Sequence, residues 1–597
     1  MSAGNAARPV VVLDPHAVAS EDELRTGTHA DVVASSTDWF SLRQVWERHG
    51  RDPHGSRVTI HVLDALHQPA DLPWDIEQGA TVCRLRVPPD PTVRALVLAV
   101  TDEDSDRLMA VVDSTPTATG LDLLAALAGV SRDALDDRPG RVRAALRLLR
   151  AGQSHTVLSY ARQALGPDPV LEGALDAVPS FDPLKELWDE WVTSPDDPDL
   201  SQLFDACRTE VSDLFLDGTL QPSLAATAVI PRWARLGTRE ASPAERLQSL
   251  MAQQPPTPLP TAPLEPWLPV AAWWGSVRNE LAQVNPPDEQ LAASAWAVWD
   301  GIDAAFLTWI RQSYGAQLGR NWVNGPKGLH QVQPYLAKQA GQDGRVLLLV
   351  FDGMSHTLWT QIRSGARMTV LHSSGTLTML PSLTEISRQA IAAADLPTAF
   401  LDTLNPSDLT EAEPVHWARA WATHERSAGW LRVDGGLADL SKVPLGHHDA
   451  IGVVISATDK QMHAARMMGD VGLHAGMKAW LRSGFLDRLL EAAEQHGYEV
   501  WVTTDHGGIE CLPTKGPNEG ALVPRAGTRH RRYANKTLRD AAVAEGIVLD
   551  SVPGLPATYG DCLLFAPGRV SWKQARISHG GLSLDEVVVP FAKVVAG

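Results

Sequence analysis

Three aspartates in the C-terminal half of the sequence follow runs of apolar residues. Asp352 ends "RVLLLVFD", Asp459 follows "AIGVVISAT" and Asp505 ends "YEVWVTTD". Such runs are typical of parallel strands buried on both faces, and ligands bind beyond the carboxyl ends of these strands. One aspartate after a strand is more simply a helix N-cap, but three together favour a shared site.

Histidines accompany two of these aspartates at spacings that suit metal binding. His463 lies four residues after Asp459, so the two side chains share one face if a helix begins there. His506 directly follows Asp505, and the two glycines after it allow a sharp turn and close approach of the backbone. His579 precedes another Gly-Gly in "RISHGGLSLDEVVVP" and is a candidate for a further imidazole. Carboxylate and imidazole groups are suitable ligands for zinc or manganese.

Two hydroxyls lie in "TLTMLPSLTEISRQAIAA", just before a predicted helix. Ser382 or Thr384 is expected to cap this helix, and Glu385 stands at the offset of a capping box with Ser382. A helix N-terminus also favours an anion or a developing alkoxide. The capping and catalytic interpretations are compatible, because one hydroxyl can cap the helix while the other acts as a nucleophile. Arg388 follows Thr384 by one helical turn, where it would pair with oxygens of a bound anion or lie on a helix surface.

The elements that position these residues differ along the chain. Short β-branched runs predict a small α/β domain over residues 1–115, and leucines at helical spacing predict a helical domain over 116–253. A proline-rich stretch and a Trp-rich helical segment fill 254–340 and are read as a boundary. Residues 341–597 alternate strand, turn and helix, as a doubly wound α/β domain does.

Composition and charge exclude several classes of protein. Of the 597 residues, 44% are hydrophobic and 21% charged, which is ordinary for a folded protein. The formal net charge of −19 disfavours general duplex binding. The four cysteines form no CxxC pair, and no long apolar run predicts a signal peptide or a membrane span, so a cytoplasmic protein without membrane contact is expected. No Walker A, HExxH or GxSxG motif is present.

The ordered set Asp, hydroxyl, Asp-x-x-x-His, Asp-His-Gly and His-Gly-Gly resembles the alkaline phosphatase superfamily. Four segments carry a closer resemblance: "LPSLTEISRQAI", "DHGG", "RHRRYA" and "HGGLSLDEVVVP". The similarity is to the PglZ branch of this superfamily, a component of BREX phage-defence systems, and it covers about residues 344–597. The resemblance implies a C-terminal α/β/α sandwich of the alkaline phosphatase kind. It also implies partners among other BREX proteins, such as methyltransferase and ATPase components.

The resemblance further implies two divalent metal ions, most often Zn²⁺, with Mn²⁺ or Mg²⁺ as alternatives. Thr384 would be the nucleophile and would bridge toward a metal, with Ser382 as second choice. The ligands would fall into two sets, one of Asp459, His463 and His579, the other of Asp352, Asp505 and His506.

The chemistry expected is phosphomonoester or phosphodiester hydrolysis through a phosphothreonine, on a nucleotide, a nucleic-acid end or another phosphate ester. The basic residues Arg529, Arg531 and Arg532 match a characteristic PglZ stretch and would hold the rest of the substrate, or else form a solvated loop. The sequence departs from many family members in "DGMSH", which lacks an arginine after the first aspartate.

Two other readings remain open at this stage. The chain is alternatively a scaffold or regulatory protein of the defence complex that retains a metal site with little hydrolytic activity. A mutase or sulfatase on the same fold is the third reading, although "PSLTEISR" lacks the C/S-x-P-x-R context that a sulfatase needs.

Overall fold

The computed structural model of the chain describes residues 9–597 apart from a set of short segments. The segments left out are 15–20, 22–23, 26–29, 37–38, 51–56, 64–71, 73–74, 77–79, 85–89, 101, 116, 177–178, 217–218, 224–229, 239–241, 321, 323–324, 342–343, 405–408 and 518–524. The chain forms two compact units, one of Met1–Ala99 with Glu103–Leu123, and one of Val100–Asp102 with Leu124–Gly597. Domain divisions at 115, 253 and 340 remain a proposal from the sequence.

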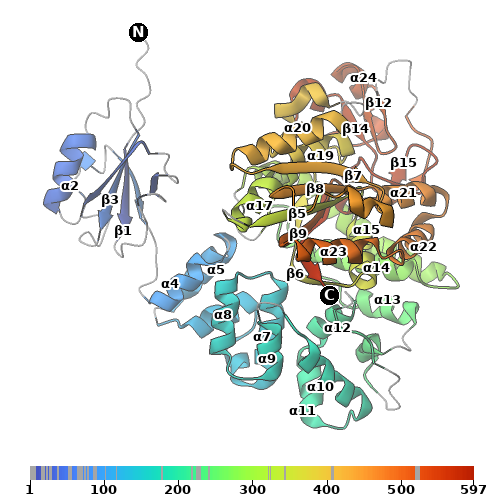
Figure 1. The fold of residues 1–597 in the computed structure, drawn as a ribbon, viewed down its shortest axis with the longest axis horizontal. Coiled ribbons are helices and arrows are strands. Elements are labelled where there is room, and N and C mark those ends of the chain that lie inside the picture. Colours follow the sequence, from blue (N-terminus) through green and yellow to red (C-terminus); the bar gives the residue numbers. More distant parts are fainter. Residues whose placement is uncertain are drawn as a thin grey trace. The chain divides into compact units, whose positions relative to one another are not determined.

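The first unit contains a four-stranded parallel sheet in the order β2-β3-β1-β4 (Figure 1). Its strands are β1 (Val10–Asp14), β2 (Val32–Ser36), β3 (Val58–Leu63) and β4 (Thr81–Arg84). The helices are α2 (Trp39–Val45) and α4 (Pro91–Leu98). Valines, leucines and isoleucines of β1 and β3 pack with Leu42 and Trp46 in one small core. A small N-terminal α/β domain is confirmed.

The N-terminal part of the second unit is helical, as its leucine spacing predicts. Its helices and short turns are α6 (Gly120–Ala128), α7 (Arg138–Arg150), α8 (His155–Ala164), α9 (Pro169–Ala174), α10 (Asp182–Thr193), α11 (Pro198–Ala206), α12 (Arg208–Leu216) and α13 (Pro243–Met251). Asp137, Ser154 and Asp197 accept hydrogen bonds from backbone N–H groups of the first turns of α7, α8 and α11. These side chains satisfy donors that a helix start leaves without partners.

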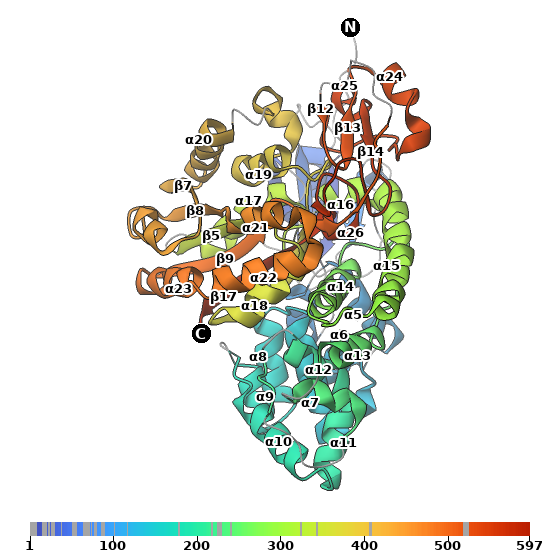
Figure 2. The same cartoon turned by 90° about the vertical axis from the view of Figure 1, so that its right-hand side faces the viewer.

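A six-stranded sheet in the order β6-β17-β9-β5-β8-β7 organises the rest of the second unit, and Figure 2 shows β7, β8, β5, β9 and β17 in this order. Its strands are β5 (Arg345–Phe351), β6 (Met368–Leu377), β7 (Ala428–Val433), β8 (Ala450–Ile455), β9 (Tyr498–Thr504) and β17 (Val588–Ala596). Strands β7, β8, β5 and β9 are mutually parallel, and β17 runs antiparallel to both of its neighbours. The expected α/β sandwich is confirmed, with a mixed rather than wholly parallel sheet.

Both faces of this sheet are covered, which explains why β5 after Arg345 and all of β8 carry only apolar residues and glycine. Val346, Leu348 and Val350 of β5 pack into one core with α14 (Trp267–Leu281), α15 (Glu289–Trp309), α17 (Val332–Ala340), α19 (Thr384–Ala393) and α20 (Leu409–Ala422). The alternate residues Leu347, Leu349 and Phe351 pack into a second core with α18 (His356–Gly365), α21 (Ala457–Ala464), α22 (Gly469–Leu481) and α23 (Phe485–Gln495). Because successive side chains of a strand point to opposite faces of the sheet, β5 contributes to both cores.

A small β subdomain follows β9. A three-stranded antiparallel sheet consists of β12 (Arg525–Ala526), β13 (His530–Arg532) and β14 (Leu563–Phe565), and lies near α24 (Lys536–Asp540) and α25 (Ala557–Gly560) (Figure 2). The pairs β10 (Ile509–Glu510) with β16 (Ile577–Ser578) and β11 (Leu512–Pro513) with β15 (Val570–Ser571) join this region to the carboxyl end of β9. Short α26 (Leu584–Val587) leads back into β17. Among the helices described, none is both long and apolar enough to cross a membrane.

Candidate metal centre and active site

Asp352, Asp505 and His506 meet at the carboxyl edge of the central sheet. Their donor atoms all lie within 4.8 Å of one another, and all three side chains are buried. Among the residues that the structure describes, this is the single trio of His, Cys, Asp or Glu side chains gathered so closely.

The strand register explains why the first trio forms. Phe351 of β5 lies beside Thr504 of β9, so the next residue of each strand is one of the two aspartates. Asp505 Oδ1 accepts hydrogen bonds from the backbone N–H groups of Gly353 and His506, both at 3.0 Å. Gly353 has φ of +80°, and a Cβ there would lie 3.3 Å from the His506 ring and closer still to Met462. The glycine is therefore needed for both its backbone conformation and its size.

One carboxylate oxygen of Asp505 has no hydrogen-bond partner. Its Oδ2 is buried and accepts no hydrogen bond, and the nearest cationic group is the Arg388 guanidinium at 3.7 Å. Burial, and next the charge of Asp352, raise the pKa of Asp505 to about 8 against the opposing effect of Arg388. A buried acceptor without a partner is costly, and a divalent cation is the group that the donor set fits. The residues present therefore fit a metal ion.

His506 presents one ring nitrogen to the candidate nucleophile. Its Nδ1 lies 2.9 Å from the Gly507 carbonyl and so carries the proton, which leaves Nε2 with its lone pair. Thr384 Oγ1 lies 3.0 Å from this Nε2. Thr384 is the first residue of α19, partly buried, and its hydroxyl reaches the trio from the helix N-terminus.

Ser382 has a different position, and the expected capping box is wrong. Helix α19 begins at Thr384, its N-cap is Leu383, and no side chain caps it. The fully buried Ser382 hydroxyl instead accepts from the Gly580 N–H at 3.0 Å and donates to the Gly581 carbonyl at 3.2 Å. Ser382 thereby fixes the His-Gly-Gly turn, because its hydroxyl bonds to the backbone of both glycines.

The same loop orients His579. Its Nδ1 lies 3.1 Å from the Ser382 carbonyl, so Nε2 again keeps its lone pair. The ring stacks on His506 with centroids 3.8 Å apart and planes 9° apart. Burial, and next the positive charge that His506 would carry, lower the pKa of His579 to about 4. The His579 ring is therefore neutral near pH 7, which is the form that binds metals.

Asp459 and His463 form the other part of the predicted ligand set. Both lie on α21, as their spacing predicts, and His463 Nε2 is 3.2 Å from Asp459 Oδ1. Burial opposes ionisation of Asp459, but the hydrogen bond from His463 and the charges of His463, His579 and His506 together hold the pKa of the carboxyl below its ordinary value. The same hydrogen bond raises the pKa of His463. These two residues do not converge with His579 as closely as the first trio does. The structure brings Asp459 and His463 together, and brings His579 to His506.

Arg388 is buried, so its interpretation as a surface helix arginine is wrong. Its Nε donates to Glu413 at 2.6 Å and its Nη1 to Asp352 at 2.9 Å. Arg432 also donates to Asp352, at 3.2 Å, and to the Ser456 hydroxyl at 2.7 Å. Arg388 therefore offsets the charges of Glu413 and Asp352, and two of its three nitrogens are committed to acids.

The arginines expected to hold substrate do not form a basic surface loop. Arg529 is 1% exposed, makes two bonds of 2.9 Å to Glu586, and donates one further hydrogen each to the carbonyls of Val570 and Gly568. Arg531 is also buried and stacks on Trp572, and the Arg532 guanidinium lies 3.9 Å from the Tyr559 ring centroid. A buried arginine with every nitrogen committed holds the subdomain together and has no donor for a substrate. We correct the expectation for Arg529 accordingly.

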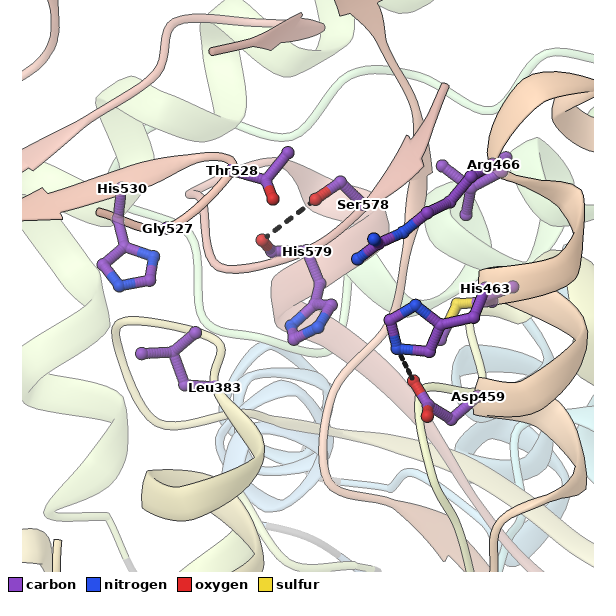
Figure 3. A pocket seen from close by; sticks show the side chains of 11 residues that line it. Leu383, Asp459, His463, Arg466, Gly527, Thr528, His530, Ser578 and His579 are labelled. Carbon is purple, nitrogen blue, oxygen red and sulfur yellow. Dashed lines mark hydrogen bonds and ion pairs between the residues drawn. The ribbon is translucent and has the colours of Figure 1, made fainter. Parts of the chain in front are cut away.

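A cavity of about 270 Å³ opens beside His463 and His579. Asp459, His463 and His579 line it, together with Arg466 and the turn Gly527–Thr528 of the small β subdomain (Figure 3). Its volume is near the lower end of the range for small-molecule sites.

Sequence reasoning missed Glu413, Arg432 and Arg466. Arg432 had a usable signal, because "AGWLRVDGG" is a fourth strand whose carboxyl end lies at the same sheet edge. Glu413 lies on α20 and Arg466 in the short 3₁₀ turn Ala465–Met467. Neither lies in a motif with recognisable spacing, since both depend on how distant helices pack.

Comparison with known protein families finds a match for the C-terminal part of the chain. Residues 329–594 match the family model described as "BREX system PglZ alkaline phosphatase-like domain". A search of curated proteins finds no match. The match to the family model spans the central sheet, both ligand sets and the residues that line the cavity.

Two solved structures are each similar to part of this chain. Murine ectonucleotide pyrophosphatase/phosphodiesterase 5, in complex with AMP, is 12% identical with a TM-score of 0.30, over 42% of this chain and 87% of that one. Phosphonoacetate hydrolase from Sinorhizobium meliloti, in complex with phosphonoacetate, is 11% identical with a TM-score of 0.31, over 42% of this chain and 90% of that one.

Proposed function

Residues 329–594 carry a PglZ alkaline phosphatase-like domain, and we propose that this domain is a metal-dependent phosphohydrolase acting within a BREX-type anti-phage system. The observation that carries the proposal is the position of the Thr384 hydroxyl, 3.0 Å from Nε2 of His506 and next to the buried carboxylates of Asp352 and Asp505. The candidate nucleophile thus lies against one candidate ligand set, and the cavity opens at the other, where His579 stacks on His506.

Each residue has a distinct part in the proposed reaction. Asp352, Asp505 and His506 would hold one metal ion. Asp459, His463 and His579 would hold the other, and both ligand sets suit zinc. A bound pair of divalent ions supplies acidity to the attacking hydroxyl and charge stabilisation to the transferred phosphoryl group.

Thr384 is proposed to attack the phosphorus atom. The bond from Thr384 Oγ1 to phosphorus forms, the ester bond to the leaving oxygen breaks, and water then releases phosphate from the phosphothreonine. The N-terminus of the ten-residue helix α19 favours the negative charge that develops beside it. Ser382 is proposed to position His579 rather than to attack, because its hydroxyl is already bonded on both sides.

Arg388 and Arg432 are proposed to balance charge at Asp352. With Asp352 and Asp505 both ionised, two buried carboxylates would repel one another strongly. The two guanidiniums reduce this repulsion and hold Asp352 in one rotamer, so that the ligand is preorganised.

The test is hydrolysis of p-nitrophenyl phosphate and bis(p-nitrophenyl) phosphate by the full chain with zinc, manganese or a chelator. We expect metal-dependent release of nitrophenolate, and a loss of about three orders of magnitude in kcat for Thr384→Ala and for Asp505→Asn. The exposed Asp550→Asn is the matched control and should keep full activity. The preferred ester would show whether mono- or diesters are the substrate class.

Two results would contradict the proposal. Equal activity of wild type and Thr384→Ala would exclude this nucleophile. Stoichiometric zinc binding without turnover of either ester would instead favour a scaffold of the defence complex, assembled with methyltransferase and ATPase partners.

A further inference from the structure

The cavity beside the ligands has chemically distinct walls. Asp459, His463 and His579 line one side and belong to the proposed metal centre. The remaining lining side chains are Leu383, Met462, Arg466, Thr528, His530, Ile577 and Ser578. A cavity with a metal end, an apolar wall and a separate cation suits an organic phosphate that carries more than one charged group.

Arg466 is the cation of this cavity. It lies three residues after His463, and its side chain extends toward His463 and His579 (Figure 3). Within the part of the chain that the structure describes, its guanidinium forms no ion pair, and the PglZ domain's other site arginine, Arg388, is committed to acids. The positive charge of Arg466 is therefore available to an anion in the cavity.

The positive charge continues beyond Arg466. Burial, and next the charges of Arg531 and Arg466, lower the pKa of Lys573, which shows that the three cations are within electrostatic range of one another. Arg531 donates to the carbonyls of Gly527 and His530, which carry no net charge and leave its own charge in place. Arg466, Arg531 and Lys573 thus form a local group of positive charge in a chain of net charge −19, and Arg466 is the member of this group that lines the cavity.

We propose that Arg466 binds a second phosphate of the substrate, separate from the phosphate that is cleaved. The substrate class is then an organic phosphate with at least one further phosphate group, whose carbon skeleton crosses the apolar wall of Leu383, Met462 and Ile577. This inference rests on the proposed function and deepens it, because it names what else the substrate of the same site must carry. Arg466 is a specificity residue, since it would contact the part of the substrate that does not react.

The test compares the binding of thymidine 5′-monophosphate and thymidine 3′,5′-bisphosphate to the full chain with zinc, by calorimetry. Wild type should bind the bisphosphate about tenfold more tightly, as one charge-assisted hydrogen bond provides. Arg466→Ala should lose this preference and keep its affinity for the monophosphate, and Arg466→Lys should keep part of it. The exposed Arg482→Ala is the matched control and should behave as wild type.

The outcomes separate this inference from the proposed function. Equal affinity of wild type for the two ligands overturns the second phosphate site. An equal loss of affinity for both ligands in Arg466→Ala also overturns it, and assigns Arg466 to the reacting phosphate. A preference that depends on Arg466 in a protein that hydrolyses no ester would sustain the inference while the proposed hydrolase fails, because binding needs no turnover.

Discussion

Single hydrogen bonds decide which atoms of the site are available for chemistry. Nδ1 of His506 and Nδ1 of His579 each face a backbone carbonyl, from Gly507 and Ser382 respectively. Each ring is thereby fixed in the tautomer that leaves Nε2 unprotonated. The same logic separates the two hydroxyls, since that of Thr384 meets His506 while that of Ser382 is used by the His-Gly-Gly turn.

At this scale we predict that Ser382→Ala weakens zinc binding without removing the nucleophile. The buried Gly580 N–H and Gly581 carbonyl lose their partner, and His579 loses its fixed orientation. Such supporting contacts typically change metal affinity by about 10- to 100-fold. Competition with a chromogenic chelator would measure the affinity for each zinc ion.

Ser387→Ala is the matched control for this variant. Ser387 is equally buried and bonds to the backbone of Met379, away from both histidines. It should lower stability while leaving zinc affinity unchanged. Equal zinc affinity in both variants would show that Ser382 has no positioning role.

Packing between elements holds the loop after β9. Arg278 on α14 is 1% exposed and donates to Asp470 at 2.6 and 2.9 Å, to Asp585, and to the Gly508 carbonyl at 3.0 Å. Trp299 of α15 donates to the same Asp585 at 2.8 Å. The Trp-rich helices therefore brace the Asp-His-Gly-Gly loop through one buried ion network.

We predict that Arg278→Met destabilises the second unit by about 3–5 kcal/mol, because it leaves two buried carboxylates without their cation. Urea denaturation followed by tryptophan fluorescence would measure this, since tryptophans are dense around the network. Arg482→Met, at the exposed end of α22, is the control and should change stability by less than about 0.5 kcal/mol. A similarly small change for Arg278→Met would mean that the network contributes little.

Sequence reasoning succeeded where short-range rules apply. The apolar runs identified β5, β8 and β9, and the parallel register then placed Asp352 beside Asp505. It failed for Arg529 and for the cap at Ser382, because both form bonds across long sequence distances, to Glu586 and to Gly581. A basic run and a capping motif look the same in sequence whether they face solvent or another loop.

At the scale of the molecule, the Trp-rich segment is part of the core of the sheet domain. Trp267, Trp274 and Trp299 share one hydrophobic core with Val346 and Leu348 of β5. Leu247 and Leu250 of α13 belong to this core as well. The composition shift at the proline-rich stretch therefore coincides with no gap in packing.

We predict that a fragment of residues 242–597 folds and binds zinc, whereas a fragment of residues 341–597 does not fold. The shorter fragment exposes the face of the sheet that α14 and α15 cover, and burial of that face is a main source of stability. Circular dichroism and a cooperative thermal transition would distinguish the two. A cooperatively folded 341–597 fragment would contradict this account of the core.

The most direct test of the central claim is mass spectrometry of the full chain, quenched in acid during turnover of p-nitrophenyl phosphate with zinc. We predict one phosphate on the peptide that contains Thr384, absent without metal and absent in Thr384→Ala. Turnover with the phosphate on another residue would contradict the assignment of Thr384 as nucleophile. The absence of labelled protein, under conditions where hydrolysis of the phosphothreonine is the slow step, would also contradict it.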